Sequence, residues 1–216
     1  MDNKPLSIQL TKNLRRSILR GHPWVYKEAI KPPPKVDEAQ LAQVFDSKKQ
    51  PVAWAIYDPN GPLALRILSL EKSKPNQGWL NKKFKTVFNL KQNFIDETTN
   101  CYRLFNGEGD ELPGLVCDIY AAVAVIQFDG IGPAQFWDVE QISNWLLEYT
   151  PCTSVVLKGR GESAKLTAGQ EFQNPVEVTE NSVLFSVDVL QGQKTGFFLD
   201  QRENRNYLKQ TCQNKS

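Results

Sequence analysis

Apolar and polar residues alternate along three stretches near the start of the chain, which is the pattern of β-strands with one buried face. The stretches are 41–46, 52–57 and 63–69, and turn-forming clusters separate them. A further strand-like stretch, 6–10, precedes them. Residues 1–72 therefore predict a small antiparallel meander or barrel, near the lower size limit for a self-sufficient core.

A change to steps of three and four residues predicts helices in two other places. The first is a short helix over 11–20, with Thr11 as the expected cap and Gly21 as its end. The second is an amphipathic helix over 73–99, in which apolar residues recur among lysines. We expect this second helix to link two domains.

Short apolar stretches return in the second half of the chain. The predicted strands are 102–105, 115–120, 123–128, 154–158, 176–178 and 183–189, and a helix is predicted over 133–149. A strand-strand-helix-strand-strand order is typical of an antiparallel sheet with one helix packed on it. The predicted fold class is therefore α+β, with the second domain over 100–190.

The charge of the chain is unevenly distributed, although the whole sequence has a formal net charge of only +2. Residues 1–35 contain eight Lys and Arg residues against two acidic residues, whereas the rest of the chain is net negative. A basic front segment suits contact with phosphates. The same charges also suit the solvent face of an ordinary helix. The low net charge excludes a uniformly basic protein of the histone type.

The sequence shows no membrane span, secretory leader or metal-binding motif. It has no run of roughly 18 apolar residues, and its first ten residues lack a continuous apolar stretch. The cysteines Cys101, Cys117, Cys152 and Cys212 form no C-x-x-C pair, and the sequence has one histidine. We therefore expect a cytoplasmic protein with reduced cysteines and no bound metal.

Three candidate catalytic or nucleotide-binding motifs lack a required feature. The stretch 159–164 has the spacing G-x-G-x-x-A, but no apolar helix follows it, so a hairpin loop is expected. At 192–196 the lysine follows Gln193, where a phosphate-binding loop needs glycine. Asp110 and Glu111 fall in a turn, which favours local hydrogen bonds over acid–base catalysis.

The strongest local signal lies in residues 193–205, QKTGFFLDQRENR. Two aromatic residues precede an expected helix start at Asp200, and Gln201, Arg202 and Arg205 follow it. Free N–H groups at a helix start, together with the forked donors of Gln and Arg, suit a carboxylate or a phosphate. A plain capped helix with solvated charges accounts for the same residues.

The 193–205 stretch closely resembles the signature of a family of class I S-adenosylmethionine (SAM)-dependent RNA methyltransferases. These are the bacterial enzymes that methylate carbon 5 of cytosine in large-subunit (23S) ribosomal RNA. Residues 10–30, LTKNLRRSILRGHPWVYKEAI, resemble the opening of that family's PUA RNA-binding domain. Residues 103–120, RLFNGEGDELPGLVCDIY, are similar to the start of its central α+β domain.

The resemblance implies a PUA domain, a central α+β domain and a C-terminal Rossmann-like methyltransferase domain. It assigns residues 1–72 to the PUA-like domain, 73–99 to the linking helix, 100–190 to the central domain, and 191–216 to a β-hairpin and the start of a truncated methyltransferase domain. No apolar strand with a Gly-rich turn follows position 210. We therefore expect the Rossmann-like domain to be missing, and the chain alone to be inactive and to bind SAM only weakly.

The resemblance also implies site residues. The expected contacts to the cofactor are Thr195, Phe197, Gln201 and Arg202. The expected RNA-binding residues are Arg15, Arg16, Arg20, His22 and Trp24, since arginines beside aromatic rings suit phosphate contact and base stacking. From the residues alone, a structural role is favoured for His22 over an RNA contact, and no catalytic residue is expected within the chain.

The function expected from these features is RNA binding and substrate positioning in SAM-dependent methylation of ribosomal RNA. The alternatives are a free-standing RNA-binding module without catalysis and a protein-interaction domain with no RNA role. Ribosomal RNA is the expected partner, with neither DNA nor membrane. A homodimer or a complementing C-terminal half is a further expectation.

Overall fold

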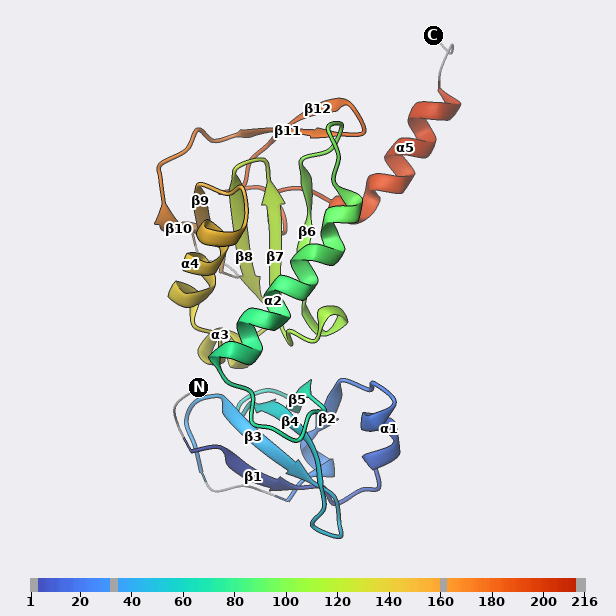
Figure 1. Cartoon of the computed structure of the whole chain (residues 1–216), viewed down its shortest axis with the longest axis vertical. Coiled ribbons are helices and arrows are strands. Elements are labelled where there is room, and N and C mark those ends of the chain that lie inside the picture. Colours follow the sequence, from blue (N-terminus) through green and yellow to red (C-terminus); the bar gives the residue numbers. More distant parts are fainter. Residues whose placement is uncertain (1–3, 32–34, 160–162, 213–216) are drawn as a thin grey trace. The chain divides into compact units, whose positions relative to one another are not determined.

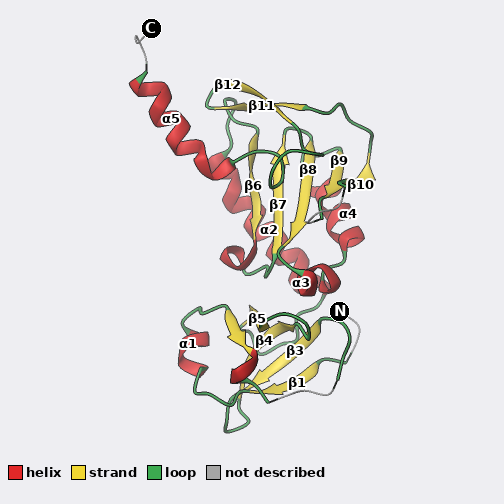
Figure 2. Cartoon of the chain, turned by 180° about the vertical axis from the view of Figure 1, so that it is seen from behind, coloured by secondary structure: helices red, strands yellow, loops and turns green. Residues whose placement is uncertain are grey.

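The computed structural model describes residues 4–31, 35–159 and 163–212. The chain divides into two compact units. The first unit contains residues 1–87, 105–116 and 128–138, and the second unit contains residues 88–104, 117–127 and 139–216. Their helices and strands are labelled in Figure 1 and are seen from behind in Figure 2.

The first unit is built around a five-stranded sheet, coloured blue to cyan in Figure 1. In spatial order its strands are β1 (Leu6–Gln9), β3 (Gln40–Phe45), β4 (Pro51–Tyr57), β5 (Leu63–Ser69) and β2 (Trp24–Tyr26). Strands β3, β4 and β5 form an antiparallel meander, which confirms the prediction from the alternating pattern. Strand β1 pairs in parallel with β3, which the sequence pattern does not reveal.

The core of the first unit gathers apolar side chains from all five strands and from the helix that follows β1. It includes Ile8, Ile18, Val25, Ala42, Ala55 and Leu65, all of which are buried. Burying one Val, Leu or Ile side chain stabilises a fold by roughly 1.5–3 kcal/mol. Ile18 is therefore the anchor that attaches the short N-terminal helix to the sheet.

Helix α1 (Arg15–Leu19) is shorter than predicted. The Thr11 hydroxyl donates a hydrogen bond to the Glu28 carbonyl oxygen and does not cap the helix. Gly21 ends this segment with a φ of +95°, a conformation that favours glycine. Ile18 is the buried residue of α1, so its other side chains are exposed or partly exposed.

Helix α2 (Gln77–Lys91) confirms the predicted amphipathic helix over a shorter range. Its start is set by Asn76, whose side-chain oxygen accepts a hydrogen bond from the Trp79 N–H at 2.9 Å. Its buried residues are Leu80, Phe84 and Val87. This spacing places them on one face, and the lysines lie on the remaining surface.

A second five-stranded sheet is formed by the middle of the chain, and Figure 2 shows its strands side by side. In spatial order they are β10 (Lys165–Gly169), β9 (Ser154–Leu157), β8 (Val123–Phe128), β7 (Leu115–Tyr120) and β6 (Cys101–Asn106). The prediction of an antiparallel sheet was wrong, because β8 and β9 are parallel neighbours. The chain passes from β8 to β9 through helix α4 (Val139–Tyr149), and such a crossover returns it in the same direction.

The helix predicted over 133–149 is interrupted and forms two helices, α3 (Ile131–Phe136) and α4. Trp137 has an extended backbone, with φ −80° and ψ 130°, which ends α3. Its buried indole N–H donates a hydrogen bond to the Pro113 carbonyl oxygen at 2.9 Å and holds this break in place. Short 3-10 turns occur at η1 (Lys27–Ala29), η2 (Gln92–Phe94) and η3 (Gly107–Asp110).

The last described part of the chain contains a hairpin and a helix. Its elements are β11 (Val176–Glu180), β12 (Val183–Val187), the 3-10 turn η4 (Leu199–Gln201) and helix α5 (Arg202–Thr211). Asn181 and Ser182 join the two strands, and both have positive φ, as a two-residue hairpin turn requires. The β-hairpin expected within 191–216 therefore lies earlier in the chain, and the described part of that range is loop and helix.

Candidate functional site

The basic front segment of the chain forms a surface on α1, the following turn and β2. Its members are the five predicted RNA-binding residues Arg15, Arg16, Arg20, His22 and Trp24, here named the N-terminal basic surface. Because only Ile18 anchors the single turn of α1, the arginines around it extend away from the core.

Two members of the N-terminal basic surface have partners within the first unit. Arg15 forms an ion pair with Asp46 at 3.0 Å. A backbone hydrogen bond from Gln50 and the nearby Arg15 guanidinium hold the pKa of the Asp46 carboxyl below its ordinary value. The Trp24 indole N–H donates a hydrogen bond to the Glu108 carboxylate at 3.0 Å, which fixes the position of the ring.

The other three members are available to a ligand. Arg16, Arg20 and His22 are exposed. Their side chains form no ion pair or hydrogen bond with any residue that the structure describes. A free guanidinium group can donate two parallel hydrogen bonds to a phosphate, so this surface suits an RNA backbone.

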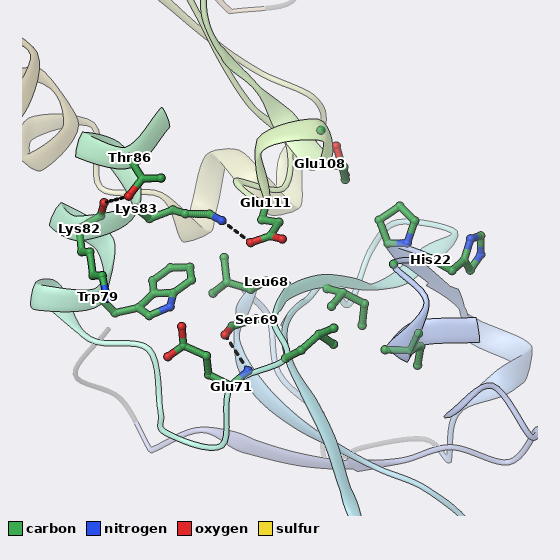
Figure 3. Close-up of a pocket in the computed structure, with 16 residues that line it drawn as sticks. His22, Leu68, Ser69, Glu71, Trp79, Lys82, Lys83, Thr86, Glu108 and Glu111 are labelled. Atoms are coloured by element: carbon green, nitrogen blue, oxygen red, sulfur yellow. Dashed lines mark hydrogen bonds and ion pairs between the residues drawn. The ribbon is translucent and has the colours of Figure 1, made fainter. Parts of the chain in front are cut away.

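A pocket of about 640 Å³ opens in the first unit, and His22 belongs to its lining. Figure 3 shows side chains from the turn after α1, the end of β5, helix α2 and the turn η3 around it. The polar and aromatic lining residues include His22, Ser69, Glu71, Trp79, Lys82 and Glu108. The sequence did not predict this pocket, because four separate segments form it and no one segment has a recognisable motif.

Two of the pocket's three carboxylates are neutralised within the first unit. Glu108 is paired with the buried Arg66 and accepts the hydrogen bond from Trp24, and Glu111 is paired with Lys83. Burial opposes ionisation of Glu108, but the hydrogen bonds from Trp24 and Arg66 outweigh it and hold the pKa of this carboxyl below 4.5. Glu108 is therefore a charged, internally paired part of the wall at neutral pH.

The segment resembling the cofactor signature is connected to a buried polar network in the second unit. Thr195 is fully buried, its hydroxyl donates to the Asp118 carboxylate, and it lies 2.8 Å from the Tyr120 hydroxyl oxygen. Arg103 donates two hydrogen bonds to Asp118, at 2.8 and 2.9 Å. Burial and the Asp118 charge raise the pKa of Tyr120, so the phenol stays protonated at neutral pH.

Phe197 also lies within an internal cluster. Its ring packs on Phe185 with a centroid separation of 5.0 Å, and the Arg205 guanidinium lies 4.2 Å from its centroid. Arg205 in turn donates two hydrogen bonds to the buried Glu180, at 2.7 and 2.8 Å. The ring and the guanidinium therefore connect α5 to the β11–β12 hairpin.

Arg202 and Gln201 differ in their accessibility. Arg202 is partly buried and donates hydrogen bonds to Asn181 at 3.1 Å and to Thr99 at 3.2 Å. Gln201 is exposed, and its side-chain oxygen accepts a hydrogen bond from Asn204 at 2.6 Å. Of the four predicted cofactor contacts, Gln201 is thus the one with an exposed side chain.

Three of the four cysteines are buried, and Cys212 is exposed. Burial raises the pKa of Cys101 to about 12 and raises those of Cys117 and Cys152 as well. Thiols that hold their protons at neutral pH are poor nucleophiles. Among the described residues no group of three His, Cys, Asp or Glu side chains could hold a metal ion.

Two further expectations from the sequence concern a glycine-containing stretch and membrane-spanning helices. The stretch 159–164, where a hairpin loop is expected, includes residues 160–162, which lie outside the described residues. No helix in the described ranges is both long and apolar enough to cross a membrane.

Comparison with known proteins gives a domain match and relatives that align with most of the chain. Residues 8–70 match the family model of the PUA-like domain. Over 93% of its length the chain is 32% identical to a ribosomal RNA large subunit methyltransferase from Deinococcus radiodurans, of which it covers 53%. It is also 32% identical over 92% of its length to ribosomal RNA large subunit methyltransferase I from Vibrio parahaemolyticus, of which it covers 52%. The chain thus spans about half the length of the curated relatives it matches.

Two solved structures are similar to the fold. A proposed SAM-dependent methyltransferase from Streptococcus mutans has a TM-score of 0.81 at 22% identity, with 94% of this chain and 54% of that chain covered. A proposed methyltransferase complexed with SAH has the same TM-score and identity, with 95% and 53% covered. At this level of identity the likeness shows the fold alone.

These matches overturn one prediction and confirm another. The prediction that a Rossmann-like methyltransferase domain is missing was wrong, because methyltransferase structures align with 94–95% of this chain. The expectation that the chain alone is inactive and binds SAM only weakly rested on that missing domain and therefore loses its support. The predicted PUA-like part is confirmed by the family match over residues 8–70.

Proposed function

We propose that this chain takes part in the SAM-dependent methylation of large-subunit ribosomal RNA, with carbon 5 of cytosine as the methylated atom. The observation that carries the proposal is its 32% identity, over 92–93% of the chain, to two proteins named as ribosomal RNA large subunit methyltransferases. The cytosine specificity is supported by the resemblance of residues 193–205 to the family signature. Such a substrate also favours a cytoplasmic location.

Within this activity, residues 1–72 are the RNA-binding domain and position the substrate. The support is the PUA-like match and the exposed, unpaired guanidinium groups of Arg16 and Arg20. These groups contact phosphates of the RNA backbone, and Trp24 offers a ring held in place by Glu108 for base stacking. Arg15 contributes less to phosphate binding, because its charge is already paired with Asp46.

SAM is the proposed methyl donor, and it supplies an electrophilic methyl group when bound. The predicted contacts fit this cofactor poorly by themselves, because Thr195 is fully buried and Arg202 is bonded to Asn181 and Thr99. We assign Thr195, Phe197 and Arg202 the role of holding residues 193–205 in place. Gln201 is the residue of this segment that we assign to direct contact with SAM.

Nucleoside analysis of ribosomal RNA tests the proposed function. The gene that encodes this chain is deleted, 23S ribosomal RNA is purified, and its methylated nucleosides are quantified by mass spectrometry. We expect the loss of one 5-methylcytidine and its return when the gene is restored. Unchanged methylation, together with salt-dependent RNA binding by the chain, would instead establish a free-standing RNA-binding module.

A matched pair of variants tests the RNA-binding surface in the same cells. The double variant Arg16→Ala/Arg20→Ala should restore less 5-methylcytidine than the wild-type gene does. The control Lys85→Ala/Lys165→Ala also removes two exposed positive charges, but outside this surface, and should restore full methylation. Equal restoration by both variants would place the RNA contact elsewhere.

A further inference from the structure

We propose that the pocket of the first unit receives one unstacked nucleotide of single-stranded RNA, and that it selects a base with an amino group. This inference rests on the proposed RNA-directed function and names a site for it. The pocket volume of about 640 Å³ lies within the range of ordinary ligand pockets, roughly 300–1,000 Å³. Ile67, which is partly buried, and Leu70, which is exposed, give it an apolar surface suited to a base.

Trp79 provides the stacking surface. It lies in the first turn of α2, where its backbone N–H is held by Asn76, and its side chain is partly buried. Its indole ring stacks on no other aromatic residue among those described. Figure 3 shows this ring extending toward Leu68, with the Glu71 carboxylate at the same end of the pocket. A free aromatic face in a concave site is what an unstacked base requires.

The charges of the pocket favour a nucleotide over a simple anion. Glu108 and Glu111 are already paired, so Glu71 is the carboxylate left to interact with a ligand. Its nearest described partner is the Ser73 hydroxyl, at 3.5 Å. Lys82 is exposed, and its ammonium group has no partner among the described residues. The Glu71 carboxylate, which accepts only this long hydrogen bond from Ser73 among those described, suits the edge of a base, and the Lys82 ammonium suits the phosphate of the same nucleotide.

The carboxylate of Glu71 determines the preferred base. A carboxylate accepts hydrogen bonds and donates none, so it suits the amino groups of cytosine, adenine and guanine. Uracil places carbonyl oxygens on both sides of its single ring N–H, and these repel a carboxylate. We therefore expect the pocket to discriminate against uracil.

The pocket is continuous with the N-terminal basic surface through His22, which belongs to both. Arg16 and Arg20 lie just before His22 in the chain and hold backbone phosphates in the proposed function. An RNA strand bound there needs to turn out only one nucleotide to place it against Trp79. An RNA strand bound by the arginines would therefore bring a nucleotide close to the pocket, which it would not do for a site far from them.

The test uses the full chain and fluorescein-labelled heptamers UUUXUUU, in which X is C, A, G or U. Anisotropy titrations should give about tenfold tighter binding when X carries an amino group. Trp79→Ala should remove about tenfold in affinity, whereas Trp79→Phe, which keeps a stacking ring, should retain most of it. Glu71→Gln should abolish the discrimination against U, and Lys85→Ala, on α2 but outside the pocket lining, should change nothing.

The outcomes separate this inference from the proposed function. If Arg16→Ala/Arg20→Ala weakens binding while the folded Trp79→Ala and Glu71→Gln variants bind as the wild type does, the pocket assignment is overturned and the RNA-binding role stands. If the chain binds none of the heptamers, cytidine and uridine monophosphates are titrated directly by NMR. No saturable shift of the Trp79 indole signal by cytidine monophosphate, or an equal shift by uridine monophosphate, also overturns the assignment.

Discussion

The N-terminal basic surface and residues 193–205 both combine arginines with aromatic rings, yet the structure uses the two sets differently. Arg16 and Arg20 are exposed and lack partners among the described residues, whereas Arg202 and Arg205 donate their hydrogen bonds within the second unit. Composition alone therefore does not distinguish a ligand-binding arginine from a structural one. The difference lies in whether the fold places hydrogen-bond acceptors within bonding distance of the guanidinium group.

A buried carboxylate accounts for this difference at Arg205, whereas Arg202 donates to the neutral side chains of Asn181 and Thr99. Asp118 and Glu180 are almost completely buried, and a buried charge is stable only when it is paired and hydrogen-bonded. Asp118 holds Arg103 and Thr195, and Glu180 holds Arg205. Among the described residues, no comparable carboxylate lies beneath Arg16 and Arg20 on the short helix α1. Contacts within the second unit therefore hold residues 193–205 in place, whereas the N-terminal basic surface keeps unpaired donors that can bind a ligand.

The largest effect is expected from Asp118→Ala. Removing this carboxylate leaves the Arg103 charge and the Thr195 hydroxyl without their acceptor, so the free energy of unfolding should fall by about 3–5 kcal/mol. Urea denaturation of the full chain measures this change. Asp200→Ala is the matched control, because Asp200 is exposed and its ion pair with Lys194 is 3.5 Å long. Decreases of equal size would show that the buried network does not order the second unit.

Thr195→Val should give the next largest change. It keeps the shape of the side chain but removes the hydroxyl shared by Asp118 and Tyr120, which should lower the free energy of unfolding by about 1–3 kcal/mol. The measurement is again urea denaturation, with the exposed Thr211→Val as the control. A neutral Thr195→Val would indicate that this residue is free to contact a ligand, which would reduce the contrast between the two regions.

The sequence predicted most elements but not how they pair. Alternation located β3, β4 and β5, and the turn near Glu180 and Asn181 located the last hairpin. The direction of β9 could not be predicted, because a period of two is the same in parallel and antiparallel sheets. Strand β10 was missed because its polar residues resemble a loop and its partner β9 supplies the order.

The candidate site was predictable only where it is local in sequence. Arg16, Arg20 and His22 lie within seven positions and could be recognised from charge and breakers. The role of Thr195 depends on Asp118, which is 77 positions away, and no spacing rule connects them. The pocket around Trp79 could not be predicted for the same reason, since its lining residues come from four separate segments of the sequence.

The double variant Arg16→Ala/Arg20→Ala should change RNA binding without changing stability. Each arginine–phosphate interaction that is removed should reduce the slope of log affinity against log salt by roughly 0.7–0.9, so the two together should reduce it by about 1.4–1.8. The free energy of unfolding should stay within about 0.5 kcal/mol of the wild type, since these are exposed surface residues. Filter binding at several salt concentrations measures the slope. Arg15→Ala should change it less, and a larger effect of Arg15 would refute the distinction between paired and unpaired arginines.

The smallest effect concerns Trp24, the aromatic member of the N-terminal basic surface that is bonded internally. Because the pKa of Glu108 is lower in the folded chain than the ordinary 4.5, ionised Glu108 stabilises the fold above about pH 4.5, and this stabilisation disappears as the pH falls through the folded value. Glu108→Gln should therefore lower the free energy of unfolding more at pH 7 than at pH 3. Trp24→Phe keeps a ring but removes the N–H donor to Glu108, so it should weaken the same acid dependence. Urea titrations at both pH values measure these differences. If Trp24→Phe leaves the acid dependence intact, the indole is not bonded to Glu108 in solution, and the distinction between Trp24 and the unpaired Arg16 and Arg20 fails.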